Sequence, residues 1–133
     1  MGKDMDCIRP QYHFRSSNKG LLAWNVRRLI ELAKSFKIKS IKLETIHEFD
    51  TEFWYDLGGA RPTCRYILEH TKLINEVNLS YPIILCKDGK IIDGMHRVCK
   101  ALLLKDEYIL AVQFEEDITP DFVDVNPDDL PYD

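Results

Sequence analysis

The sequence has no long apolar run. None of its segments approaches the about 18 consecutive apolar residues that identify a membrane-spanning helix. Its start, MGKDMDCIRP, also lacks the apolar stretch of a secretory signal. We therefore expect a cytoplasmic protein that has no membrane partner.

Cysteine is sparse and widely spaced. The four cysteines form no CxxC pair and have no histidine at zinc-site spacing (Cys7, Cys64, Cys86 and Cys99). This pattern favours reduced, mostly buried thiols over disulfides or a structural metal. A chain of 133 residues with 45% hydrophobic composition can bury a sizeable core as one domain. Neither a disulfide nor a structural metal is therefore needed for folding.

Basic residues are missing from the end of the chain. Residues 115–133 hold eight acidic residues and no Lys or Arg, whereas residues 1–114 hold 14 acids and 18 Lys or Arg. We therefore expect a lead-in at 1–17, a mildly basic domain at 18–114 and an acidic tail at 115–133. One interpretation is a solvated tail. The other is a tail that docks on the body, where its acids compete with anions; the docking side chains would be Phe122, Val125, Leu130 and Tyr132.

Hydrophobic periodicity predicts two longer helices. The run Ser16-Ser17-Asn18 offers good N-cap residues, and apolar residues then recur at helical spacing. This pattern predicts a helix near 18–36. Alternation around Ile41 and Leu43 predicts a half-exposed strand. Residues 47–63 are expected to form a long loop or short helical turn. Thr63 can then cap a helix that runs to about Val77.

The second half of the domain carries the strongest local signal. YPIILCKDGKIIDG predicts two short strands joined at Asp88-Gly89, a dipeptide suited to a tight hairpin turn. A short helix from Val98 to Leu104 and a last strand, YILAVQF, follow. The resulting order αβαββαβ predicts an α+β fold of one domain, with a small mixed four-stranded sheet and about three helices.

The corner between the second hairpin strand and this last helix gathers polar residues in the run KIIDGMHRVCKA. Gly94 lets the backbone approach a ligand, and a helix N-terminus together with His96 and Arg97 favours phosphate. Asp93 would repel a bare phosphate, so it fits best beside Mg²⁺ or a substrate hydroxyl. The alternative is that Asp93 caps the helix while His96 and Arg97 lie on a solvated first turn.

The run YPIILCKDGKIIDGMHRVCKALLL and the following AVQF resemble the ParB/sulfiredoxin superfamily over roughly residues 38–114. This resemblance implies a ParB/sulfiredoxin-like domain with a nucleotide held at the corner. Sulfiredoxins have a reactive cysteine where this chain has Met95, and a thioether supplies no thiolate. Chromosome-partition ParB proteins carry Gly-Glu-Arg-Arg and a helix-turn-helix module, which this chain does not match. The corner is most similar to the Asp-Gly-His-His-Arg of the free serine kinases, from which only Met95 departs.

The same resemblance indicates a catalytic acid after the first strand. In those kinases an acid at this place acts near the substrate hydroxyl, which points to Glu48 here, with Glu52 and Asp50 behind it. Phosphoryl transfer to an alcohol requires a carboxylate within hydrogen-bond reach of the attacking oxygen. An ordinary acidic surface loop is the alternative explanation of these residues.

The leading hypothesis is a nucleotide-binding protein that takes ATP or ADP with Mg²⁺. Arg97 and His96 would bind phosphates, Gly94 would admit them, Asp93 would hold the metal or a hydroxyl, and Glu48 would be the base for phosphate transfer to a small hydroxyl substrate. The alternative is a DNA-associated ParB-like binding module or nuclease, because residues 1–114 are mildly basic. A third alternative is an interaction module that works through its acidic tail. The sequence leaves open whether the protein is a kinase or a nucleotide sensor.

Overall fold

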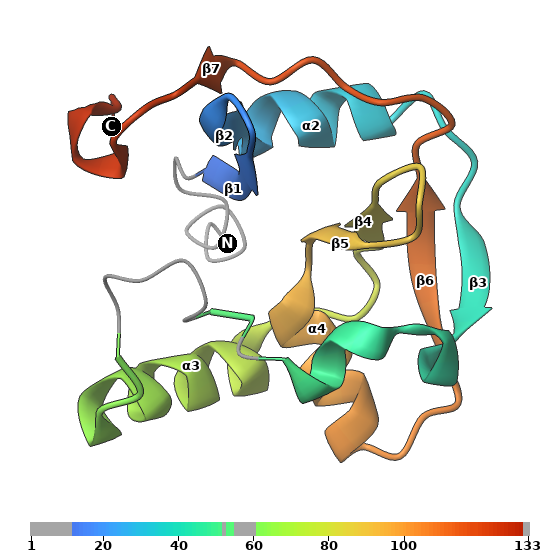
Figure 1. Cartoon of the computed structure of the whole chain (residues 1–133). Coiled ribbons are helices and arrows are strands. Elements are labelled where there is room, and N and C mark those ends of the chain that lie inside the picture. Colours follow the sequence, from blue (N-terminus) through green and yellow to red (C-terminus); the bar gives the residue numbers. More distant parts are fainter. Residues whose placement is uncertain (1–11, 52, 55–60, 132–133) are drawn as a thin grey trace.

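The computed structural model describes residues 12–51, 53–54 and 61–131 of the chain, and Figure 1 shows the arrangement of its elements. In this part of the chain, seven strands form two sheets, accompanied by three α-helices and three short 3-10 helices. The strands are β1 (Tyr12–Ser17), β2 (Gly20–Asn25), β3 (Lys39–Lys42), β4 (Ile83–Leu85), β5 (Ile91–Asp93), β6 (Tyr108–Gln113) and β7 (Phe122–Val123). The helices are α2 (Val26–Ala33), α3 (Cys64–Glu76) and α4 (Met95–Leu103), with η1 (Leu43–Thr45), η2 (His47–Asp50) and η3 (Pro127–Asp129).

The larger sheet has four strands in the order β3-β6-β4-β5. β6 runs antiparallel to β3 and parallel to β4, and β5 is antiparallel to β4, so the sheet is mixed. From α2 to β6 the elements follow the predicted order αβαββαβ. The predicted α+β class and mixed four-stranded sheet are therefore confirmed.

Two local predictions are also confirmed. Thr63 is the N-cap of α3, and its side chain accepts a hydrogen bond from the Tyr66 amide at 3.2 Å. The β4–β5 hairpin turns at Asp88-Gly89, where Gly89 has a φ of +85°. Both signals depend on residues close together in the chain, which is why the sequence was sufficient to find them.

The four-stranded sheet is covered on both faces. Successive strand residues point to opposite faces, so Ile83 and Leu85 of β4 pack with α4 while Ile84 packs with α2. On the α2 side, Leu29 and other buried residues complete a smaller core. Because α4 begins immediately after β5, its N-terminus lies at the edge of the sheet, beside the strand-to-helix corner (Figure 1).

The prediction of one helix near 18–36 was wrong in its first part. Residues 20–25 form β2, which pairs with β1, and the helix begins only at Val26, after the N-cap Asn25. The helix also ends earlier than predicted, at Ala33. Apolar residues at helical spacing did not reveal β2, because they continue without a break into α2; pairing of β2 with β1 on one side and β7 on the other overrides this local pattern.

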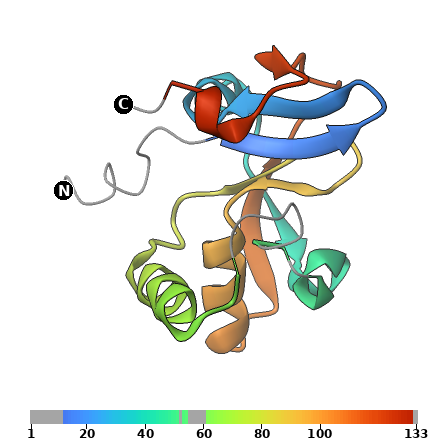
Figure 2. The same ribbon diagram turned by 60° about the vertical axis from the view of Figure 1, so that its left-hand side comes forward.

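The acidic tail docks on the body, as the second interpretation predicted. We call residues 115–131 the C-terminal strap. β7 pairs with β2 to complete a three-stranded sheet, and Leu130 is buried. Figure 2 shows the β1–β2 hairpin and the strap at one end of the molecule, and α3 and α4 at the other. Tyr132, also expected to contribute, lies outside the described residues.

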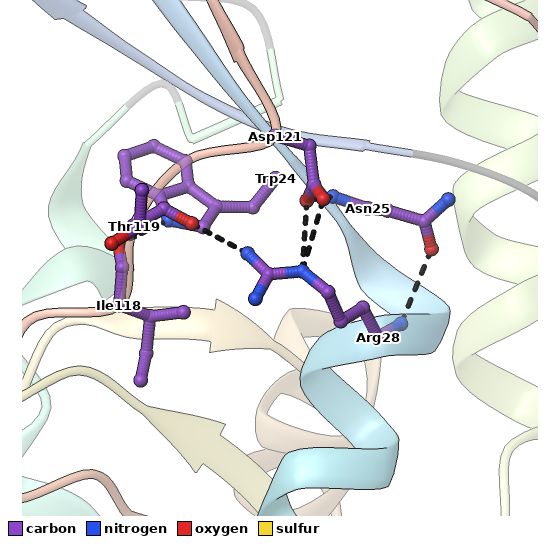
Figure 3. A network of polar contacts seen from close by, with 6 residues as sticks. All are labelled: Trp24, Asn25, Arg28, Ile118, Thr119 and Asp121. Atoms are coloured by element: carbon purple, nitrogen blue, oxygen red, sulfur yellow. Dashed lines mark hydrogen bonds and ion pairs between the residues drawn. The ribbon is translucent and has the colours of Figure 1, made fainter.

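Polar contacts fix the strap to the start of α2 (Figure 3). Trp24 Nε1 donates to the Ile118 carbonyl at 2.7 Å. Arg28 Nε lies 3.0 Å from Asp121 Oδ1, and its Nη2 donates to the Thr119 carbonyl. The backbone amide of Asn25 also donates to Asp121 at 2.7 Å. The strap therefore helps to hold α2 in place.

Candidate functional site

The corner is built around Gly94, which has a φ of +114° and is the N-cap of α4. A Cβ atom at this position would lie 2.6 Å from Ile83 Cγ2 and 2.9 Å from Arg97 Nη2. These atoms belong to the protein itself, so close packing of the corner on β4 already explains the glycine. The approach of a ligand at Gly94 stays a prediction.

Asp93 and Arg97 form an ion pair beside this glycine. Arg97 Nη2 lies 2.9 Å from Asp93 Oδ2, and 16% and 19% of the two side chains, respectively, are exposed. The residues are four apart in the sequence, with Asp93 at the end of β5 and Arg97 in the first turn of α4, so the pair spans the corner. Within the described part of the chain, Arg97 Nε is buried and has no hydrogen-bond partner. Such an unsatisfied donor costs about 1–3 kcal/mol. Because this Nε is buried, a ligand could bond to it only after the Arg97 side chain shifts.

Both residues of this ion pair line a cleft of about 890 Å³ between α2 and the sheet, which we call the α2 cleft. The α2 wall supplies Arg27, Glu31 and Lys34. Rings and aliphatic side chains form most of the remaining lining, including Phe36, Ile38, Tyr81, Ile84 and Val112. The cleft thus combines a charged end with an extensive apolar surface.

His96 points elsewhere. It does not line the α2 cleft, and its Nε2 lies 2.8 Å from Nδ1 of His70, on α3. The Trp54 ring stacks on both imidazoles, with centroid distances of 4.0 Å to His70 and 4.7 Å to His96. The structure therefore separates the predicted phosphate ligands: Arg97 faces the cleft, and His96 contacts α3 and Trp54.

The environment of His96 keeps it uncharged at neutral pH. Burial, followed by the nearby His70 and the Arg97 guanidinium, lowers the pKa of His96 to about 4. Burial also lowers the pKa of His70, although Glu69 acts in the opposite direction. The sequence analysis did not foresee this cluster, because Trp54, His70 and His96 come from three separate segments.

Glu48, the predicted base, lies in η2. Its Oε1 accepts a hydrogen bond from the backbone amide of Ile91 at 2.8 Å. β5 is an edge strand, so this bond satisfies an amide at the edge of the sheet. Asp50 is exposed in the same short helix, and Glu52 lies outside the described residues. The hydrogen bond between Glu48 and the Ile91 amide therefore stabilises the fold.

Asp93 is the predicted metal ligand. Among the residues that the structure describes, no group of three or more His, Cys, Asp and Glu side chains could hold a metal ion. Magnesium that arrives with a nucleotide commonly uses only one or two carboxylates together with phosphate oxygens. Asp93 fits this second arrangement and not a metal site made by the protein alone.

Two general findings complete this description. None of the described helices is long and apolar enough to cross a membrane. Comparisons with protein families, curated proteins and solved structures found no match to this chain. The functional argument therefore depends on the residues and the geometry given above.

Proposed function

We propose that this chain is a ParB/sulfiredoxin-like protein that binds ATP or ADP in the α2 cleft. The observation that carries the proposal is the position of Arg97, which lies on the cleft wall beside Asp93. Its guanidinium has the forked geometry that suits phosphate oxygens. The resemblance of the corner to the free serine kinases points to the same residue.

The composition of the α2 cleft fits a nucleotide. Its volume of about 890 Å³ falls in the range of small-molecule sites, which are mostly apolar with a few polar groups. Phe36 and Tyr81 offer rings near which a base could lie, while Arg97 and Lys34 can neutralise phosphate charge. His96 is not included in this set, because it is uncharged at neutral pH and directed toward His70.

Magnesium enters this proposal with the nucleotide. Asp93 would be its single protein ligand, and phosphate oxygens and water would supply the rest. The present Asp93–Arg97 pair would then be shared with the metal and the phosphates. The ion would neutralise phosphate charge close to the Asp93 carboxylate, which otherwise repels it.

Phosphate transfer to a small hydroxyl substrate is the activity that the resemblance suggests. The substrate oxygen would attack the terminal phosphorus of ATP, ADP would leave, and a carboxylate would take the hydroxyl proton. Glu48 does not line the α2 cleft, and its Oε1 accepts a hydrogen bond from the Ile91 amide, so the geometry gives no support to Glu48 as that base. We therefore propose nucleotide binding first, with transfer as a separate hypothesis.

The DNA-associated alternative has less support. Arg28, at the start of α2, is bound to Asp121 and Thr119 of the strap. Asp121 therefore removes positive charge from the start of α2. A DNA-binding role predicts affinity that falls with salt and that ATP does not reduce.

A cytoplasmic location belongs to the same proposal. The described cysteines Cys64, Cys86 and Cys99 are free thiols. Free thiols are usual in proteins of reducing compartments.

Calorimetric titration with ATP, ADP, CTP and AMP, with and without Mg²⁺, tests the proposal. Arg97→Lys is the informative variant, because it keeps a positive charge beside Asp93 but loses the forked guanidinium. A hydrogen bond to a charged group is worth about 1.5–3 kcal/mol, so affinity should fall by roughly tenfold or more. Circular dichroism should show an unchanged fold. The absence of saturable binding by any of these nucleotides would contradict the proposal.

A further inference from the structure

A second hollow lies on the other side of the larger sheet. It has a volume of about 630 Å³ and is lined by seven residues between Lys42 and Asp50, by Leu102 of α4, and by Asp106 and Glu107, which follow that helix. We call it the η1–α4 groove. In Figure 1 the short helices η1 and η2, coloured blue-green to green, lie beside α4. The groove shares no lining residue with the α2 cleft.

Apolar side chains line this groove, namely Leu43, Ile46 and Phe49 together with Leu102 of α4. Leu102 is 51% exposed, and the two leucines that follow it, Leu103 and Leu104, are 68% and 57% exposed. Exposed apolar side chains gathered at the end of one helix commonly mark an interaction site. A small ligand inside the groove would leave these two leucines uncovered, so the surface fits a segment of a macromolecule better.

The rim of the groove is acidic. Glu44, Asp50, Asp106 and Glu107 line it, against a single lysine, Lys42. His47 also lines it. A surface of this sign repels the phosphates of nucleic acids and of anionic lipids and attracts basic protein segments. The charge thus selects between the classes of macromolecule that could cover the apolar floor.

We propose that the η1–α4 groove docks a basic amphipathic helix of another protein. Its apolar side chains would fill the groove and cover Leu103, and its Lys and Arg side chains would meet the rim carboxylates. Recognition of this kind uses apolar anchors at i, i+3, i+4 and i+7 with charges beside them. The inference does not depend on nucleotide binding, because the groove and the α2 cleft are separate.

Fluorescence anisotropy with synthetic peptides tests this assignment. The probe is a labelled peptide of about four helical turns with Leu on one face and Lys elsewhere. The controls are the same peptide with Glu in place of Lys, and a scrambled Leu/Lys peptide without an apolar face. We expect saturable binding of the Leu/Lys helix alone, with affinity that falls as salt is added.

Matched variants of the protein locate the binding. The double variant Glu44→Lys/Glu107→Lys reverses two charges on the rim, and Leu103→Ser removes apolar surface while keeping the charge. Glu115→Lys/Glu116→Lys makes the same change in net charge beyond the other end of β6. We expect a loss of about tenfold or more for the rim variant, a clear loss for Leu103→Ser, and a change of less than about twofold for the control.

Several results would overturn the inference. Equal weakening by the two charge-reversal doubles would indicate general attraction to an acidic protein. Comparable binding of the Leu/Glu or scrambled peptide, or no saturable binding at all, would show that the groove does not select a basic amphipathic helix. If sedimentation showed that the protein alone self-associates, and Leu103→Ser abolished this, a second copy of the chain would be the occupant instead.

Discussion

Replacement of Gly94 by alanine should strongly destabilise the protein. The added Cβ would lie 2.6 Å from Ile83 Cγ2, and the backbone φ of +114° is strained for any residue with a side chain. A left-handed conformation costs about 1–2 kcal/mol, and overpacking of a well-filled core costs about 1–3 kcal/mol. Together these terms predict a loss of about 2–5 kcal/mol in the free energy of unfolding.

Gly89 provides the matched control for this substitution. Its φ is +85°, but the nearest atom to an added Cβ, Gln113 Nε2, is 3.9 Å away, so Gly89→Ala introduces backbone strain without a clash. It should therefore cost only about 1–2 kcal/mol. Urea denaturation measures both variants, and the slope of the transition should not change. Equal losses for Gly89→Ala and Gly94→Ala would refute the close packing of the corner on Ile83.

Three further predictions concern other contacts. Glu48→Ala should lower the free energy of unfolding by about 0.5–1.5 kcal/mol, because the Ile91 amide loses its acceptor, whereas Glu48→Gln should cost less; urea denaturation distinguishes them. His96 has a folded pKa of about 4, below its unfolded value, so the unfolded state binds more protons and stability should fall as pH falls below 6.5. The free energy of unfolding should therefore depend less on pH between pH 6.5 and 5 in His96→Asn than in the unaltered protein. The two slopes should differ by up to about 1.4 kcal/mol per pH unit. Asp121→Ala should speed amide hydrogen exchange at the start of α2, because it removes the partner of Arg28; unchanged exchange would contradict the bracing role of the strap.

The parts of the fold that depend on neighbouring residues were predictable. Thr63 began a helix and Asp88-Gly89 made a hairpin because capping and turn geometry are local. β2 was missed although β1, with which it makes most of its pairs, directly precedes it in the sequence. The apolar residues of β2 continue the helical spacing of α2, which follows directly, and hairpin pairing overrode that pattern.

The arrangement of the corner was partly predictable. His96 and Arg97 were both predicted to bind phosphate, but successive residues of a helix point about 100° apart, and the two side chains have different neighbours. The sequence analysis did not foresee the ion pair between Asp93 and Arg97. The stacking of Trp54 on His70 and His96 left no trace in the sequence, because the three residues meet only in the folded chain.

The most direct test of the central claim compares two neighbouring lysines. Lys34 lines the α2 cleft, where its Nζ lies 2.8 Å from Glu31 Oε2, whereas Lys37 does not line the cleft. Both lysines are exposed, and either Lys→Ala change removes the same charge. Calorimetric titration with ATP and Mg²⁺ should give weaker binding for Lys34→Ala and unchanged binding for Lys37→Ala. Equal effects of the two substitutions, or no binding to the unaltered protein, would contradict a nucleotide site in the α2 cleft.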